Sequence, residues 1–142
     1  MNRIPRILVL CTGNSCRSQM AEGFLRQAFG EWTVVRSAGV VAHGLNPRAV
    51  AVMAEAGVDI SEHRSKTIEE LEGEYFDHVI TVCDHARENC PWLPTAAQRW
   101  HQDFLDPAIA VGTEEEILAE FRWVRDLIRE YCVRFARDVD RV

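Results

Sequence analysis

The sequence predicts a single α/β domain, built on an open parallel sheet of about four strands with helices on both faces. Short apolar runs alternate along the chain with longer segments of helical periodicity, and this alternation is typical of βαβ units. The chain of 142 residues suits one domain, and its hydrophobic content of 47% is enough for a core. No repeat, low-complexity tract or linker divides the chain, so residues 1–142 are expected to form one domain.

The expected elements can be placed from apolar runs and from helix-capping residues. Residues 7–10 form an apolar run that predicts the first strand, and residues 78–82 form a second strand-like run. Asn46 suits the N-cap of the second helix, with Pro47 in its first turn and Gly57 just past its end. In order, we expect strand 5–10, helix 18–29, strand 32–36, helix 47–56, strand 77–83, a short helix 84–90, strand 98–101 and a long helix 114–137.

The last two helices have opposite character. In helix 114–137 the apolar residues recur at three- and four-residue steps opposite charged ones, which predicts a face packed on the core. Those residues are Ile117, Phe121, Val124, Ile128, Tyr131 and Phe135. Segment 84–90 is short and polar and is followed by Pro91, so we expect a helix that unwinds easily.

The most informative segment is residues 11–18, Cys-Thr-Gly-Asn-Ser-Cys-Arg-Ser, between the first strand and the first helix. A loop at the positive end of a helix can surround a tetrahedral oxyanion with backbone N–H groups, and Arg17 adds a planar fork of donors. The same field lowers the pKa of a thiol, so we expect Cys11 to be a thiolate nucleophile. Asn14 suits a left-handed backbone conformation, and Ser18 could cap the helix or donate to Cys11. The predicted anion contacts are Thr12, Gly13, Asn14, Ser15, Cys16, Arg17 and Ser18.

This octet resembles the active-site loop of the low-molecular-weight protein tyrosine phosphatase superfamily, which contains phosphatases and thioredoxin-coupled arsenate reductases. Ser-Ala-Gly at 37–39, Asn-Pro-Arg-Ala at 46–49 and Asp106 before Pro107 also stand where the resemblance expects them. The resemblance covers nearly the whole chain and implies one catalytic domain. It also implies that Asp106 is the general acid; the alternative is an aspartate that precedes proline in an ordinary turn.

Cys83 and Cys90 separate the two activities. On an intact helix, residues seven apart lie about 10 Å apart along the axis, whereas a disulfide needs Cα atoms within roughly 4.4 to 6.8 Å. Pairing them therefore requires segment 84–90 to unwind. The Cys-x6-Cys pair resembles the redox pair of the thioredoxin-coupled arsenate reductases, and a plain phosphatase has no chemical use for it.

The resemblance implies a three-cysteine relay that serves arsenic detoxification. Cys11 attacks arsenate, with Arg17 balancing charge, and Asp106 protonates the departing oxygen. Cys83 then attacks the Cys11 sulfur and releases arsenite, and Cys90 resolves the disulfide so that thioredoxin, the electron donor, can reduce it. Phosphate and sulfate are expected to compete for the loop.

Two other functions are compatible with the same loop. A low-molecular-weight phosphatase would use the first step alone and would not need Cys83 or Cys90, but residues 108–110, Ala-Ile-Ala, lack the aromatic side chains that frame phosphotyrosine in such phosphatases. A redox or oxyanion sensor would need a partner-binding element for which the chain has no room.

Cys16 could form a protective disulfide with Cys11 or be a buried loop thiol.

Some reductases of the superfamily bind a monovalent cation through an asparagine and an acidic residue of the first helix. Asn14 and Glu22 match these two ligands, but residues 63–66, His-Arg-Ser-Lys, bring cationic side chains to the remaining positions. We hypothesise that Lys66, the single lysine of the chain, supplies the positive charge near Glu22 that potassium supplies elsewhere. The alternative is a solvated surface lysine.

Composition narrows the partners and the compartment. A net charge of −6 disfavours nucleic acid, and no apolar stretch reaches the ~20 residues of a membrane span. Five cysteines without a secretory leader favour a cytoplasmic protein with reduced thiols. The cysteines and histidines lack metal-site spacing, so we expect no metal and no bound cofactor. A monomer is the default expectation.

Overall fold

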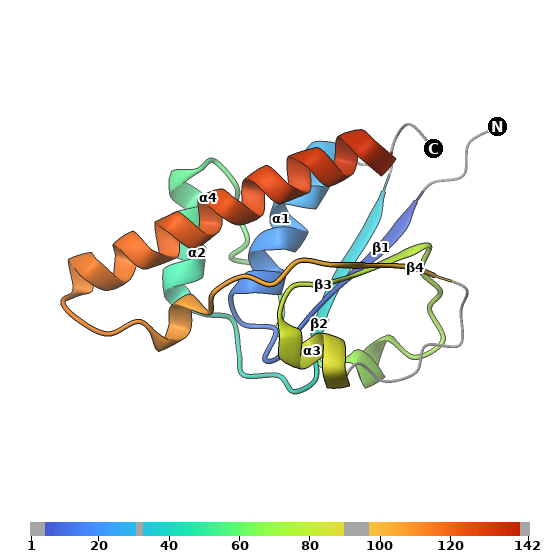
Figure 1. Ribbon diagram of the computed structural model, residues 1–142, viewed down its shortest axis with the longest axis horizontal. Helices are drawn as coiled ribbons and strands as arrows, with labels where there is room; N and C mark the ends of the chain where they lie inside the picture. The colour runs from blue at the N-terminus through green and yellow to red at the C-terminus, as the bar shows by residue number, and fades with distance from the viewer. Residues whose placement is uncertain (1–4, 31–32, 90–96, 140–142) are drawn as a thin grey trace.

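The structure is a computed structural model of the chain, and it describes residues 5–30, 33–89 and 97–139. Every expected strand and helix is present (Figure 1). The elements are β1 (Arg6–Cys11), α1 (Arg17–Phe29), β2 (Val34–Gly39), α2 (Pro47–Glu55), β3 (His78–Thr81), α3 (Asp84–Asn89), β4 (Gln98–His101) and α4 (Glu114–Val139). Two short 3-10 helices, η2 (Ile68–Leu71) and η3 (Pro107–Ile109), were not predicted. The largest difference from the expected boundaries is at β2, which begins and ends two or three residues later than predicted.

The four strands form one parallel sheet in the order β2-β1-β3-β4, which confirms the predicted fold class. Strand β1 is central, with Leu10 aligned with Ala38 of β2 and with Thr81 of β3. The chain runs to one side of β1 for β2 and returns to the other side for β3. In open parallel sheets such a reversal opens a crevice at the carboxyl ends of the strands, and Cys11 lies there.

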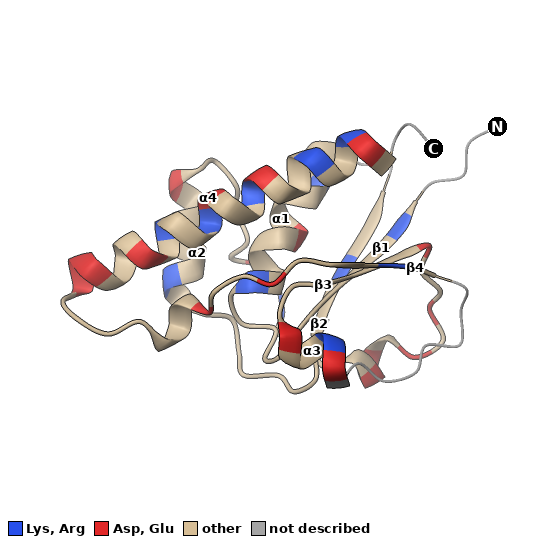
Figure 2. Ribbon diagram, viewed as in Figure 1, with Lys and Arg blue, Asp and Glu red and all other residues tan. Residues whose placement is uncertain are grey.

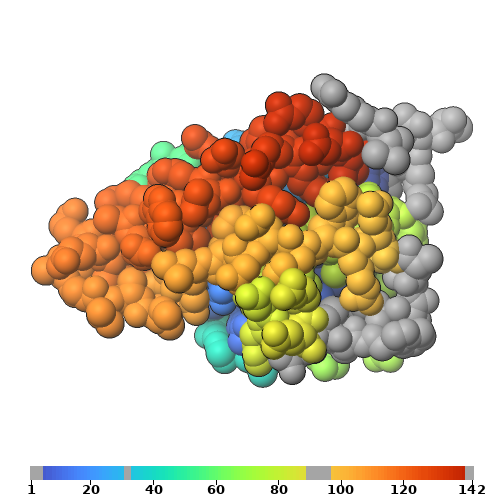
Figure 3. All heavy atoms as spheres, in the orientation of Figure 1, coloured from blue at the N-terminus to red at the C-terminus, as the bar shows by residue number. Residues whose placement is uncertain are grey.

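Helices cover both faces of this sheet. In Figure 1, α1, α2 and α4 lie on one side, and α3 and η2 lie on the other. Residues 7–10 of β1 are consequently all buried, although their side chains alternate between the two faces. The space-filling view shows segment 97–110 between α4 and α3 (Figure 3).

Helix α4 has the amphipathic pattern that the sequence predicts. Four of the six predicted apolar residues are buried, namely Phe121, Val124, Ile128 and Phe135. Its outer side carries both signs of charge (Figure 2). None of the helices in the described ranges is long and apolar enough to cross a membrane.

The N-termini of α1 and α2 differ in their capping, and this difference bears on anion binding at the crevice. Asn46 caps α2 as predicted, since its Oδ1 accepts from the N–H groups of Arg48 and Ala49. Helix α1 has Cys16 at its N-cap and no side-chain cap bond. The first N–H groups of α1 are therefore not used by a capping side chain, and they can serve an anion.

Gly39 joins the end of β2 to the loop after β1. A Cβ there would lie 2.2 Å from the carbonyl oxygen of Val41 and 2.8 Å from both Asn14 N and Thr12 O. These are backbone atoms of the two loops that follow β1 and β2, and they cannot give way as the end of a side chain would.

We therefore expect Gly39→Ala to lower the free energy of unfolding by about 3 kcal/mol. The midpoint of thermal unfolding should fall by roughly 10 °C. Calorimetry would measure it, with Val41→Ala as control because it truncates an exposed side chain of the neighbouring segment. An equal fall in both variants would refute the steric argument.

Candidate active site

Cys11 and Cys83 meet at the carboxyl end of the sheet. Cys11 is the last residue of β1 and Cys83 follows β3, so the parallel pairing of these strands places the two residues side by side. Both are buried, with 3% of each residue exposed, and their side chains share a hydrogen bond. Thr12 Oγ1 lies 3.2 Å from Cys83 Sγ, and the N–H of Ala86 donates to the same sulfur over 3.3 Å.

The hydrogen bond between Cys11 and Cys83 acts in opposite directions on the pKa values of the two thiols. The bond from Cys11 lowers the pKa of Cys83 to about 5, against the effect of burial, and Thr12 and Ala86 add to the lowering. The pKa of Cys11 is raised, first by the bond with Cys83 and then by burial, and these outweigh Arg17 and the N–H of Thr12. The two sulfurs thus titrate as a pair that shares one negative charge, and the thiolate expected at Cys11 stays a prediction.

A small cavity opens beside Cys11. It has a volume of about 120 Å³, and its lining comes from the loop after β1 and from two other segments. The lining residues are Cys11, Thr12, Gly13, Ser15, Cys16, Arg17, His43, Asp106 and Ala108. Arg17 Nη1 donates to the carbonyl of Phe104 over 3.0 Å, and Nη2 lies 3.7 Å from Asp106 Oδ2. Asp106 Oδ1 accepts from the N–H of Ala108, which fixes the carboxyl group at the cavity.

Asn14 holds the loop in shape. Its φ is +49°, the left-handed conformation that the sequence predicted, and its side chain is fully buried. Its Nδ2 donates to Ser18 Oγ (2.8 Å) and Ser37 Oγ (3.0 Å), while its Oδ1 accepts from Gln19 Nε2 (3.0 Å) and Lys66 N (2.9 Å). Ser18 therefore neither caps α1 nor bonds Cys11 in the described structure; it accepts a bond from Asn14.

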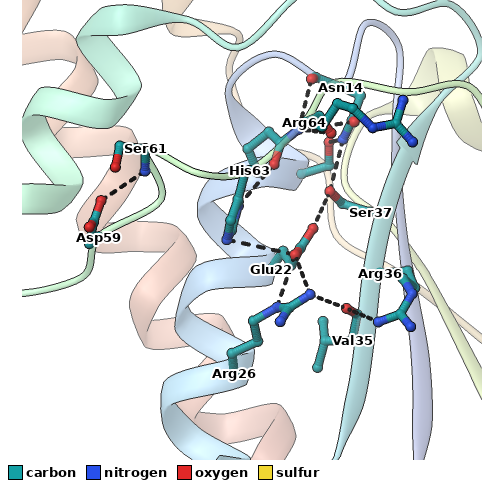
Figure 4. A network of polar contacts seen from close by, with 12 residues as sticks. Asn14, Glu22, Arg26, Val35, Arg36, Ser37, Asp59, Ser61, His63 and Arg64 are labelled. Carbon is teal, nitrogen blue, oxygen red and sulfur yellow. Dashed lines mark hydrogen bonds and ion pairs between the residues drawn. The ribbon is translucent and has the colours of Figure 1, made fainter.

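Glu22 continues this network on α1 (Figure 4). Ser37 Oγ donates to Glu22 Oε1 over 2.6 Å, and Arg26 Nη2 lies 2.8 Å from Oε2. His63 Nε2 lies 3.7 Å from the same oxygen. Lys66 Nζ donates instead to the carbonyl of Arg64. The positive charge in direct contact with Glu22 is therefore Arg26, one helical turn away. Lys66 makes no such contact, but Glu22 acts to raise its pKa, so Lys66 lies within the field of the carboxylate and its compensating role stays a hypothesis.

The sequence profile of the family described as "Low molecular weight phosphotyrosine protein phosphatase" matches residues 6–142. The chain belongs to this family. Among curated relatives, the arsenate reductase of Bacillus licheniformis is 53% identical over 130 residues, which cover 92% of this chain and 94% of that protein. The arsenate reductase of Bacillus subtilis is 50% identical over the same shares of both chains.

Solved structures agree with this membership. "An arsenate reductase in the phosphate binding state" has a TM-score of 0.77 and 30% identity, over 94% of this chain and 98% of the other. An arginine phosphatase from Geobacillus stearothermophilus has a TM-score of 0.76 and 26% identity, over 96% and 93% of the two chains. The family members similar to this chain therefore include both reductases and a phosphatase.

The structure describes two of the remaining three cysteines, Cys16 and Cys132, and both are buried. Cys90 lies outside the described residues, so its predicted partnership with Cys83 remains a prediction. Cys16 is buried, and burial raises its pKa to about 11 against the effect of Ser15. Cys132 is buried in α4, and burial raises its pKa as well. Neither thiol is activated.

Sequence reasoning missed part of the site. Gln19, Arg26 and His43 carry contacts that it did not assign, and Ser37 entered it only through the family motif. The spacing of Glu22 and Arg26 on one helix was a usable signal for their ion pair. His43 had no such signal, because its contacts with the loop join segments far apart in the sequence.

The shared proton of the two thiols can be tested by substitution. In Cys11→Ala the bond that lowers the pKa of Cys83 is gone, so that pKa should rise from about 5 toward the ordinary thiol value. Wild-type Cys83 should lose its thiolate only as the pH falls through about 5. Ultraviolet absorbance of the thiolate during a pH titration would measure this. Cys132→Ala is the control, and a Cys83 titration unaffected by Cys11→Ala would refute the shared bond.

The ion pair at Glu22 predicts indifference to potassium. The thermal unfolding midpoint of the wild type should be equal in potassium and sodium at constant ionic strength. Arg26→Ala leaves the buried Glu22 carboxylate short of a partner, so its midpoint should fall by roughly 5 °C and rise again with potassium. Lys66→Ala is the matched control and should behave as the wild type. A fall in the midpoint of Lys66→Ala that potassium reverses, with Arg26→Ala unchanged, would instead identify Lys66 as the charge that compensates Glu22.

Proposed function

We propose that this protein is an arsenate reductase that acts in arsenic detoxification, with thioredoxin as its electron donor. The observation that carries the proposal is the second thiol: Cys83 lies in hydrogen-bond contact with Cys11, and Cys11 lines a cavity sized for a small anion. Named arsenate reductases that are 53% and 50% identical over 92% of the chain support it. Residues 1–142 would act as one catalytic domain, as a cytoplasmic monomer.

In the first step arsenate occupies the loop. The N–H groups of the loop and the Arg17 fork hold its oxygens, as they would hold competing phosphate or sulfate. Cys11 passes its proton to the Cys83 thiolate and attacks arsenic, forming an S–As bond. Asp106 protonates the oxygen that departs as water. The loop contacts assigned to Thr12, Gly13, Ser15 and Cys16 belong to this step.

In the second step Cys83 attacks the Cys11 sulfur. The S–As bond breaks, its electron pair stays on arsenic, and arsenite leaves with the proton that Cys83 releases. Two thiols are thereby oxidised to a Cys11–Cys83 disulfide while arsenic is reduced by two electrons. The short helix α3, which begins just after Cys83, would have to unwind before Cys90 could attack Cys83 and free Cys11. Thioredoxin would then reduce the Cys83–Cys90 disulfide by thiol exchange.

A phosphatase is the second candidate, and the family itself favours it. Cys11, Arg17 and Asp106 around one cavity suffice for a phospho-enzyme, so we expect a slow side activity on aryl phosphates. The exposed side chains beside Asp106, such as Ile109, are aliphatic and give no aromatic frame for phosphotyrosine. A pure phosphatase would also leave the contact between Cys83 and Cys11 without a use.

The test is arsenate-dependent NADPH oxidation coupled through thioredoxin and its reductase, with aryl-phosphate hydrolysis measured in parallel. Cys83→Ser and Cys90→Ser should each lower arsenate turnover by at least about a hundredfold, because each removes an electron-carrying thiol. Ester hydrolysis should remain within about threefold for Cys90→Ser, because that step needs only the loop and Asp106. Cys132→Ser, which removes a buried thiol of α4, is the matched control.

Two results would contradict the proposal. Wild-type protein that hydrolyses the ester but turns over no arsenate would be a phosphatase. Full arsenate turnover in Cys90→Ser would remove the third thiol from the relay and the internal disulfide from the reaction with thioredoxin.

A further inference from the structure

The anion cavity has one basic lining residue outside the loop and outside the predicted site. His43 lines it together with Cys11, Arg17 and Asp106. It belongs to the segment between β2 and α2, more than twenty residues from the loop in sequence. Its position is therefore a product of the tertiary fold.

Backbone hydrogen bonds hold this segment against the loop. The N–H of Val40 donates to Cys11 O (3.2 Å), that of Val41 to Thr12 O (3.0 Å), and that of His43 to Gly13 O (2.9 Å). Each successive carbonyl from the end of β1 into the loop thus has a partner in the segment. The backbone of His43 is fixed relative to the residues that would surround an anion.

The imidazole ring lies directly on Gly13. A Cβ at Gly13 would stand 2.5 Å from His43 Nδ1 and 3.0 Å from Cγ, so the ring occupies the space that a side chain at Gly13 would need. The ring is exposed on its other side. Among the described residues no protein group is hydrogen-bonded to a ring nitrogen of His43. An N–H donor is thus held at the rim of the cavity without a protein acceptor.

An anion in the cavity would supply that acceptor. Arg17 commits Nη1 to the carbonyl of Phe104, and its Nη2 faces Asp106, so part of its donor capacity is used within the protein. The oxygens of a tetrahedral anion that point out of the loop need further donors. His43 is the one histidine, lysine or arginine besides Arg17 among the lining residues.

We propose that His43 is a substrate-binding residue, whose imidazole N–H donates to an outward-facing oxygen of the bound oxyanion. The proposal rests on the proposed function for its substrate, arsenate, and extends to phosphate by the same chemistry. The segment after β2 would then take part in anion recognition as well as join β2 to α2.

Calorimetric titration with inorganic phosphate tests the binding without any redox step. His43→Ala should weaken phosphate binding about tenfold, since a hydrogen bond to a charged group is lost. His43→Gln keeps an N–H donor and should bind phosphate within about threefold of the wild type. Val41→Ala is the matched control, because it truncates an exposed side chain of the same segment. In the coupled assay His43→Ala should raise KM for arsenate about tenfold, with kcat within about threefold.

Unchanged phosphate affinity in His43→Ala would overturn the proposal, as would an equal loss in Val41→Ala. A His43→Gln variant as weak as His43→Ala would overturn the assignment of a hydrogen-bond donor. These outcomes are separate from a failure of the reductase proposal, because a protein without arsenate turnover still yields the phosphate titration.

Discussion

The site depends on one buried side chain, Asn14, in a strained backbone conformation at the end of β1. Its amide makes four hydrogen bonds, to the start of α1, to β2 and to the backbone of Lys66. These bonds offset the cost of a left-handed φ in a residue other than glycine. Through them the loop is tied to α1, β2 and the backbone of Lys66, and Arg17 begins a helix whose first turn lacks a side-chain cap. The anion site is therefore preorganised by the protein in the absence of an anion.

The strand order then decides what chemistry the loop can support. Because β3 pairs directly with β1, Cys83, two residues past the end of β3, arrives beside Cys11. The two thiols share a proton, and this contact lowers the pKa of the Cys83 thiol before an anion binds. A loop of this kind serves phosphate and arsenate alike. The neighbouring thiol gives a reductase a second nucleophile where a phosphatase would leave the work to water.

Charge compensation in this chain is local. The protein carries a net charge of −6, yet the anion cavity contains Arg17, and the buried Glu22 behind it is neutralised by Arg26 across one turn of α1. Interactions between exposed charges farther apart than a Debye length of about 8 Å are largely screened. The overall negative charge is thus compatible with anion capture, because the groups that meet the anion are within contact distance.

The sequence by itself determined the order of strands and helices, the parallel sheet, the anion loop, the left-handed Asn14 and the Asn46 cap. All of these depend on spacing or on residues adjacent in the chain, where local periodicity and capping chemistry decide the outcome. Only the tertiary structure decided that Cys83 shares a proton with Cys11 and that His43 reaches the cavity. Those features depend on contacts between segments twenty to seventy residues apart, whose distances and relative desolvation follow from strand pairing and packing. The loop alone predicts a lowered pKa at Cys11, through Arg17 and backbone N–H groups, whereas burial and the contact with Cys83 raise it.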